Sequence, residues 1–164
     1  MTDITRADRR IVVGVEDSDA AEGALRWAVG EAEITGASVE VVYAWRRAAS
    51  VPGKLPTIRV PDEEYQSAAD DLLHTLVGAV QWPPTVPLVA TAVEGEPDEV
   101  LASRARGASL LVVGASSGGR LLPCSPALRA TPLSRRPCPL VIVASGSHSN
   151  DRSGSTVARA QLHA

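Results

Sequence analysis

The sequence predicts an open, doubly wound α/β domain, with a five-stranded parallel sheet and helices on both faces. Short runs rich in Val, Leu and Ile recur along the chain without polar alternation, as in strands that are buried on both faces. Segments with apolar residues at helical spacing separate these runs, and such alternation gives right-handed crossovers and a parallel sheet. The 164 residues, 45% of them hydrophobic, fit one domain with its own core.

The first strand is expected at Arg10–Val15, where the sequence reads "RIVVGV". Polar residues follow it, and either Asp17 or Ser18 can cap the next helix. That helix should end at Gly36, because glycine readily adopts the left-handed conformation that closes a helix. Its small apolar positions at helical spacing are Ala21, Ala24, Leu25, Ala28 and Ala32.

The middle of the chain repeats this pattern. A second strand is expected at 38–44, and a long loop, 45–60, follows with several Pro and Gly breakers. A second helix begins at Pro61, and the acidic residues after it suit the positive end of the helix dipole. The buried stripe of this helix is predicted to be Tyr65, Ala69, Leu72, Leu76 and Val80.

The last third of the domain supplies three strands. The third is expected at 88–93, and a short helix then opens on Pro97 and ends by Gly107. The fourth lies at 109–113 and the fifth at Leu140–Ala144. Between these two strands lie a loop and a weak helix, 126–136, which Pro132 must shorten or kink.

The ends of the chain lack the patterns of the domain. Residues 1–8 are expected to be an N-terminal tail and 9–145 the folded domain. Residues 146–164 are rich in Ser and lack periodicity, so they offer little apolar surface to offset the entropy of ordering. We expect them to form a flexible C-terminal tail without secondary structure.

Composition and charge argue against several classes of function. The formal net charge is −3 and the basic residues are scattered or paired, which disfavours nucleic-acid binding. The apolar runs are too short to cross a bilayer and no cleavable leader pattern is present, so we expect a soluble cytoplasmic protein that does not contact membranes. The two cysteines and three dispersed histidines form neither a disulfide framework nor a metal site.

Ligands of doubly wound sheets bind at the carboxyl ends of the strands, where the strand order reverses. Two segments are therefore candidates for a binding site, 15–18 after the first strand and 114–127 after the fourth. The second opens with "GASSGGR", whose amides, hydroxyls and Arg120 could hold a phosphate. Trp45 ends the second strand at the same edge and either walls a base pocket or packs in the core.

Other chemically reactive residues have simpler interpretations. Cys124 precedes a helix start, which lowers a thiol pKa, but only four residues separate it from Arg129, whereas cysteine-dependent phosphatases have five. We therefore interpret it as a chance loop cysteine, and Cys138, before the last strand, as a buried one. His74 lies on a helix face without an evident Asp or Ser partner and is expected to be solvated.

The ordered set of segments resembles the universal stress protein family. "RIVVGVEDSDAAEGALRWAVGEA" is similar to its first strand and helix, "VVYAW" to its second strand, "VEGEPDEVLASRARGASLLVVG" to its third helix unit and "RPCPLVIV" to its closing strand. The match covers roughly 9–144, and its weight comes from the order of the pieces, since each alone is common. The resemblance implies a Rossmann-like fold of the adenine nucleotide alpha hydrolase type. It also implies a homodimer, paired through the last strand, Leu140–Ala144.

One large subgroup of that family binds ATP through a loop of fixed spacing. The loop has glycine, two residues, glycine, nine residues, glycine, and then serine or threonine. In this chain the first glycine is Gly114. Ser117 holds the second position, although Gly118 and Gly119 follow at once and supply similar backbone freedom.

The far end of the loop departs from the subgroup. Counted back from the closing strand, the loop is one residue shorter than in the subgroup, and its final glycine and hydroxyl positions fall on Pro126 and Ala127. An amide donor and a hydroxyl are therefore absent, although Ser125 could shift in to replace the hydroxyl. At the end of the first strand, Glu16 stands where the family usually has aspartate, and Asp17 where glycine is frequent.

The sequence therefore favours a dimerising stress-response interaction module with altered or lost nucleotide binding. The alternative is an adenine-nucleotide-binding stress regulator that holds ATP, with Mg, on the 114–120 loop. An enzyme such as a slow ATP hydrolase comes third, because no positioned base, nucleophile or metal-ligand set supports it. The candidate nucleotide-binding residues are Glu16, Asp17, Ser18, Ala44, Val113, Gly114, Ser116, Ser117, Gly118, Gly119, Arg120, Ser125, Ala127 and Leu128.

Overall fold

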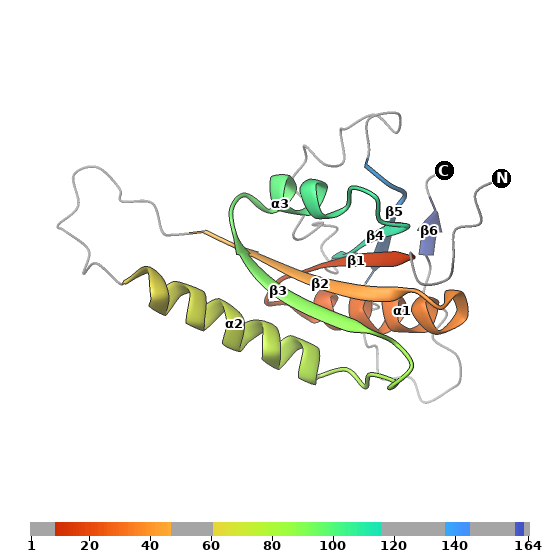
Figure 1. Ribbon diagram of the computed structural model, residues 1–164, viewed down its shortest axis with the longest axis horizontal. Helices are drawn as coiled ribbons and strands as arrows, with labels where there is room; N and C mark the ends of the chain where they lie inside the picture. Colours follow the sequence, from red (N-terminus) through yellow and green to blue (C-terminus); the bar gives the residue numbers. More distant parts are fainter. Residues whose placement is uncertain (1–8, 47–60, 116–136, 145–159, 163–164) are drawn as a thin grey trace.

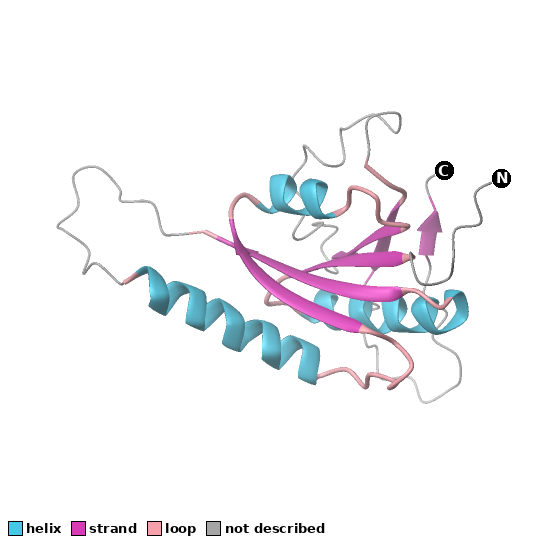
Figure 2. Cartoon of the chain, in the orientation of Figure 1, coloured by secondary structure: helices cyan, strands magenta, loops and turns pink. Residues whose placement is uncertain are grey.

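The computed structural model describes residues 9–46, 61–115, 137–144 and 160–162, shown in Figures 1 and 2. Its strands are β1 (Arg10–Val15), β2 (Ser38–Trp45), β3 (Leu88–Glu94), β4 (Leu110–Ala115), β5 (Leu140–Ala144) and β6 (Ala160–Leu162). They form one sheet in the order β3-β2-β1-β4-β5-β6. The pairings from β3 through to β5 are parallel, which confirms the predicted five-stranded parallel sheet, and β6 is added antiparallel to β5.

Helices cover both faces of this sheet, as the sequence predicts (Figure 1). They are α1 (Asp19–Thr35), α2 (Asp62–Gly78) and α3 (Pro97–Arg104). Buried residues of α1 and α2 form one core layer with the sheet, and those of α3 form the other. Successive residues of β1 supply both layers, since Val13 belongs to the first and Val12 to the second.

Helix α1 is built from small residues and packs closely on the sheet. Its buried face includes every apolar position that the sequence predicts, together with Ala20 and Val29. Gly36 ends it in the left-handed conformation, with φ of 68°, and the Gly36 N–H donates to the carbonyl of Ala32 at 2.8 Å. Ser18 occupies the N-cap position, but its side chain makes no capping hydrogen bond.

The buried face of α2 differs from the predicted stripe at one position. It begins at Asp62, directly after Pro61, and its buried residues are Ala69 and Leu73, whereas Leu72 is only partly buried. The prediction of Leu72 as a core residue is therefore wrong. The helix lies over β2 and the edge strand β3, so the angle at which it crosses this edge decides which of two adjacent leucines faces inward.

Strand β4 runs two residues further than the sequence suggests. Gly114 and Ala115 continue the ladder with β5, where they pair with Val143 and Ala144. Gly114 is thus the penultimate residue of a strand and not the first residue of a loop. The weak helix expected at 126–136 lies outside the described residues.

The C-terminal segment also corrects an expectation. No secondary structure is expected in 146–164, yet Ala160–Leu162 form β6 beside β5. The reason is the sheet edge, because an edge strand presents unpaired N–H and C=O groups that any extended segment can satisfy.

An ion-pair cluster joins the strands and α3 at the end of the sheet opposite the carboxyl edge. Glu40 of β2 is 6% exposed and is the one buried charged residue among those described. Its carboxylate accepts hydrogen bonds from Arg10 and, at 3.0 Å, from Nη1 of Arg104. The Arg10 guanidinium also donates to the carbonyls of Arg104 and Arg106, each at 3.0 Å, and so caps the C-terminal end of α3.

Candidate functional site

The strand order reverses between β1 and β4, because β1 leads to β2 and β3 on one side while β4 and β5 lie on the other. In the ladders, Gly14 lies beside Val113 and Val15 beside Tyr43, so these neighbouring strands end at the same edge. The structure therefore brings the candidate segment after β1 next to the end of β4. Doubly wound sheets bind their ligands at this position of the sheet.

Six candidate residues lie in the described part of this edge, and their accessibility differs. Asp17 is exposed, while Glu16, Ser18 and Ala44 are partly exposed. Val113 is 0% exposed and belongs to the core layer of α3, so its side chain offers no surface to a ligand. Gly114 is buried as well. The remaining candidates, Ser116, Ser117, Gly118, Gly119, Arg120, Ser125, Ala127 and Leu128, lie outside the described residues.

The turn after β1 carries negative charge. Burial raises the pKa of Glu16 above its ordinary value of 4.5, the neighbouring Asp17 carboxylate raises it further, and the Ser18 hydroxyl beside it partly opposes both effects. Burial also raises the pKa of Tyr43 above 10.0, with further contributions from Asp17 and Glu16. Ionised carboxylates only accept hydrogen bonds, so this corner suits the hydroxyls of a sugar and not a phosphate.

The same turn holds a buried hydroxyl. The Ser18 N–H donates to the Glu16 carbonyl at 2.8 Å, and the Ala21 N–H donates to the Ser18 carbonyl at 3.0 Å. Oγ of Ser18 is buried and makes no hydrogen bond of good geometry with the described residues, although it lies near enough to the Glu16 carboxylate to lower its pKa.

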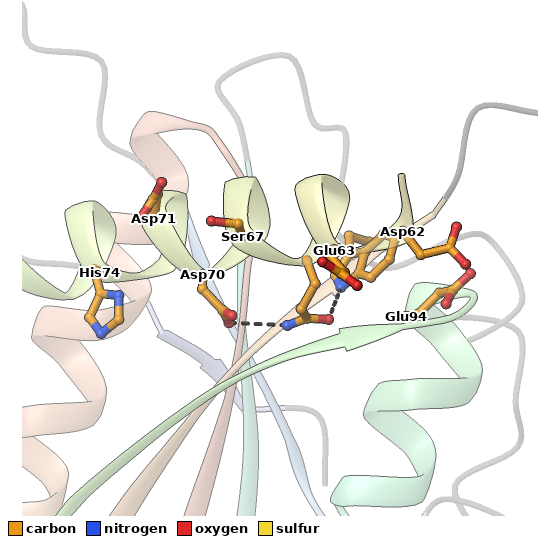
Figure 3. A pocket seen from close by; sticks show the side chains of 9 residues that line it. Asp62, Glu63, Ser67, Asp70, Asp71, His74 and Glu94 are labelled. Atoms are coloured by element: carbon orange, nitrogen blue, oxygen red, sulfur yellow. Dashed lines mark hydrogen bonds between the residues drawn. The ribbon is translucent and has the colours of Figure 1, made fainter. Parts of the chain in front are cut away.

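A separate pocket of about 570 Å³ lies on the α2 side of the sheet (Figure 3). Trp45 is 8% exposed there and stacks on Tyr65, with ring centroids 6.2 Å apart and planes 8° apart. Its indole N–H donates to Oε1 of Gln66 at 3.1 Å, and Nε2 of Gln66 donates to Oδ1 of Asp70 at the same distance. The pocket is lined by Trp45, Asp62, Glu63, Gln66, Ser67, Asp70, Asp71, His74 and Glu94.

Trp45 packs in the core, as one of the two interpretations of it holds, and it also lines this cavity. The sequence reasoning missed Gln66 and Asp70, although Gln66, Asp70 and His74 recur at four-residue spacing and so mark one polar face of a helix. Carboxylates dominate the lining, and Figure 3 shows those of Asp62 and Glu94 pointing toward each other. Such a lining repels a phosphate.

The universal stress protein family model matches residues 8–125 of the chain. The chain belongs to the universal stress protein family. The match begins at residue 8, just before β1, contains β1 to β4 and ends at residue 125, while β5 lies beyond it. None of the curated proteins compared with the chain matches it.

Solved structures of universal stress proteins share the fold. One family member from Burkholderia pseudomallei is 26% identical, with 84% of this chain and 96% of that chain covered and a TM-score of 0.53. A universal stress protein in complex with cAMP is 23% identical, covers 84% and 98% of the two chains and gives 0.53. A family member from Arabidopsis thaliana with AMP bound is 16% identical, covers 88% and 97% and gives 0.55.

Gly114 has a structural role in this universal stress protein that needs no nucleotide. A Cβ atom added to it would lie 2.4 Å from the carbonyl oxygen of Ala20 and 2.8 Å from the Ala20 Cβ. Glycine at this position therefore allows the first turn of α1 to approach β4. Its presence at the first position of the subgroup's loop is not by itself a sign of phosphate binding.

The other reactive residues of this universal stress protein give no second site. Across the described ranges, no group of His, Cys, Asp and Glu side chains could hold a metal ion. Cys138 is partly buried against the α3 core layer, and burial raises the pKa of its thiol while the charge of Arg10 opposes this. His74 is exposed on α2, and Cys124 lies outside the described residues. Within the part of the chain that the structure describes, no helix is long and apolar enough to span a membrane.

Proposed function

We propose that this universal stress protein is a dimerising interaction module of the stress response in which nucleotide binding is altered or lost. The observation that carries the proposal is the mismatch at the carboxyl edge. The described part of that edge presents the carboxylates of Glu16 and Asp17, and the loop beyond it has Pro126 and Ala127 where ATP-binding relatives have glycine and a hydroxyl. A phosphate at this edge would thus face the carboxylate acceptors of Glu16 and Asp17, and at Pro126 and Ala127 it would lack the amide and hydroxyl donors of the ATP-binding relatives.

The alternative function is adenine-nucleotide binding on the 114–120 loop, and two observations favour it. Proteins of the same fold are described as complexes with cAMP and with AMP. The hydroxyl of Ser18 and the carboxylate of Glu16 lie together at the strand ends, where a ribose would bind. In this alternative, Ser116, Ser117 and Arg120 take the place of the missing phosphate donors.

Thermal unfolding with and without millimolar Mg-ATP, AMP and cAMP separates the two functions. A ligand present at 100 times its dissociation constant adds about 2.7 kcal/mol to the free energy of unfolding, which raises the melting temperature by several degrees. An unchanged melting temperature with all three ligands supports lost binding, and a clear rise supports the alternative. A rise that Asp17→Asn leaves intact but Glu16→Ala abolishes would assign the contact to Glu16.

A restored loop gives the matched positive control. If the two replaced positions account for the loss, Pro126→Gly with Ala127→Ser should gain a thermal shift with Mg-ATP that the natural sequence lacks. No gain in a variant that folds normally would mean that Glu16 and Asp17, or the shorter loop, prevent binding.

The dimer is the second half of the proposal and concerns β5. This strand reads Leu-Val-Ile-Val-Ala, is strongly apolar and lies near the edge of the sheet, next to β4 on its inner side. β6 covers the outer side of β5 in this chain, and once that side is open an apolar strand favours pairing with another chain. Sedimentation analysis over a range of concentrations tests the dimer, and a protein that stays monomeric at every concentration would contradict it.

A further inference from the structure

The proposed dimer would form through the outer backbone edge of β5, and β6 of the same chain already forms hydrogen bonds with this edge. Strand β6 pairs antiparallel with β5, with Val141 beside Leu162, Ile142 beside Gln161 and Val143 beside Ala160. Figure 1 shows β6 at the side of the sheet away from α2. Because a strand has only two edges and β4 takes the other, β6 and a second copy of the chain need the same N–H and C=O groups of β5.

The β5–β6 ladder is the shortest in the sheet. It contains three residue pairs, whereas β4 and β5 share five and β2 and β3 share seven. Leu140 and Ala144, the two ends of β5, take part in the ladder with β4 but not in the ladder with β6. Since each pair adds only a modest net stabilisation, a ladder of three pairs opens far more readily than its neighbours.

We infer that β6 is a detachable cap that competes with a second copy of this chain for the edge of β5. The inference rests on the dimer in the proposed function. A two-fold axis normal to the sheet pairs β5 antiparallel with β5 of the second copy, which is the same direction as its pairing with β6. The two partners therefore exclude each other, and the C-terminal segment sets the concentration at which the protein dimerises.

The competition should change the dimer dissociation constant measurably, because β6 must leave β5 in both chains before the two β5 strands can pair. If β6 is bound about ten times as often as it is free, the competent fraction of each chain is about one in eleven, and the dimer dissociation constant rises roughly 100-fold. Removing the cap should therefore strengthen dimerisation by up to two orders of magnitude without any change in the dimer interface.

The experiment compares the full chain with two uncapped forms by sedimentation velocity. One form ends at residue 159, and the other carries Gln161→Pro and Leu162→Pro. Adjacent residues of a strand direct their N–H groups to opposite sides, so two consecutive prolines remove at least one donor to β5 whichever residue provides it. Ser153→Pro with Ser155→Pro is the matched control, because these two positions precede β6.

We expect both uncapped forms to dimerise at least about tenfold more tightly than the full chain, and the control to match the full chain. Hydrogen exchange of the backbone amides at 141–143, measured at concentrations where each form is monomeric, should be faster in the uncapped forms. Thermal melts confirm that each variant remains folded.

Three outcomes would overturn the inference. Equal dimer affinity in the full and uncapped forms would remove β6 as a competitor while leaving the dimer intact. A dimer that disappears on truncation would mean that β6 is donated to the other chain. If every form stays monomeric although exchange at 141–143 accelerates on truncation, the cap exists but the dimer of the proposed function does not.

Discussion

The α-carbon of Gly114 lies directly against the backbone of Ala20, so closely that a methyl group on Gly114 would sit 2.4 Å from the Ala20 carbonyl oxygen. The contact joins the end of β4 to the first turn of α1, at the point where the strand order reverses. Backbone atoms on both sides leave no flexible group that can move aside. Helix α1 and strand β4 can therefore keep their present separation only with glycine at this position.

Gly114→Ala is therefore expected to destabilise the fold by about 1–3 kcal/mol, the usual range for overpacking a core. Urea denaturation measures the change. Gly30→Ala is the matched control, since a Cβ at Gly30 in α1 meets nothing within 4 Å. Replacing a helical glycine with alanine should stabilise by about 0.5–1 kcal/mol. If the two variants change the free energy of unfolding equally, the close contact of Gly114 with Ala20 does not affect stability.

Glu40 should be among the charged residues that matter most to stability. Glu40→Gln leaves Arg10 and Arg104 without their shared carboxylate, and breaking a buried ion pair destabilises by about 3–5 kcal/mol. The two arginines are partly exposed, so we expect the lower end of this range. Glu22→Gln is the control, because its pair with Arg26 is exposed and spans one helical turn, worth about 0.3–0.5 kcal/mol.

The raised pKa of Glu16 predicts a specific dependence of stability on pH. The folded state binds this proton more tightly than the unfolded state, so ionised Glu16 destabilises the fold at neutral pH. As pH falls through the folded pKa toward 4.5, Glu16 takes up its proton and the destabilisation disappears. Glu16→Gln should thus raise the melting temperature at pH 7, and the gain should shrink on acidification.

Two further measurements check the cause of this shift. Asp17→Asn should lower the pKa of Glu16 in an NMR titration, because the Asp17 charge is one of its causes. Glu33→Gln, which removes an exposed carboxylate near the opposite end of α1, controls for the change in net charge. A gain from Glu16→Gln that is equally large at pH 7 and near 4.5 would contradict the assignment.

Gln66 is expected to stabilise the protein through the indole of Trp45. Gln66→Leu removes the acceptor of the Trp45 N–H and leaves a largely buried donor unpaired, which should destabilise by about 1–3 kcal/mol. Ser67→Ala, at the next and exposed position of α2, should change stability by less than about 0.5 kcal/mol. Chemical denaturation compares the two, and similar small effects in both would show that water replaces the lost acceptor.

Most of the fold could be predicted from the sequence because its core elements have strong local patterns. The run at Arg10–Val15 predicts β1 to the residue, and Gly36 marks the end of α1. The prediction fails by one position at Leu72 because a helical stripe drifts around the helix and only the partner surface selects its centre. It also fails at Gly114, which the sequence assigns to a loop although β5 extends the ladder past it.

The candidate site could be predicted only in part. The ends of β1 and β4 do lie side by side, since the alternation of strands and helices already implies a reversal of strand order near the first strand. The burial of Val113 and the charge effects between Glu16 and Asp17 could not be read from the chain, because both depend on what packs around them. Gln66 was missed because a lone glutamine on a polar helix face carries no signal of its own.

The sequence by itself determined the order and type of the elements, because hydrophobic periodicity is local and reports directly whether a segment is buried as a strand or as a helix. Tertiary structure alone decided which distant groups meet. The Glu40 carboxylate joins Arg10 and Arg104, which lie 30 and 64 residues away, and β6 finds the edge of β5 although its three residues show no strand pattern. Such contacts depend on geometry that exists only once the sheet has formed, when open backbone edges and buried charges select their partners.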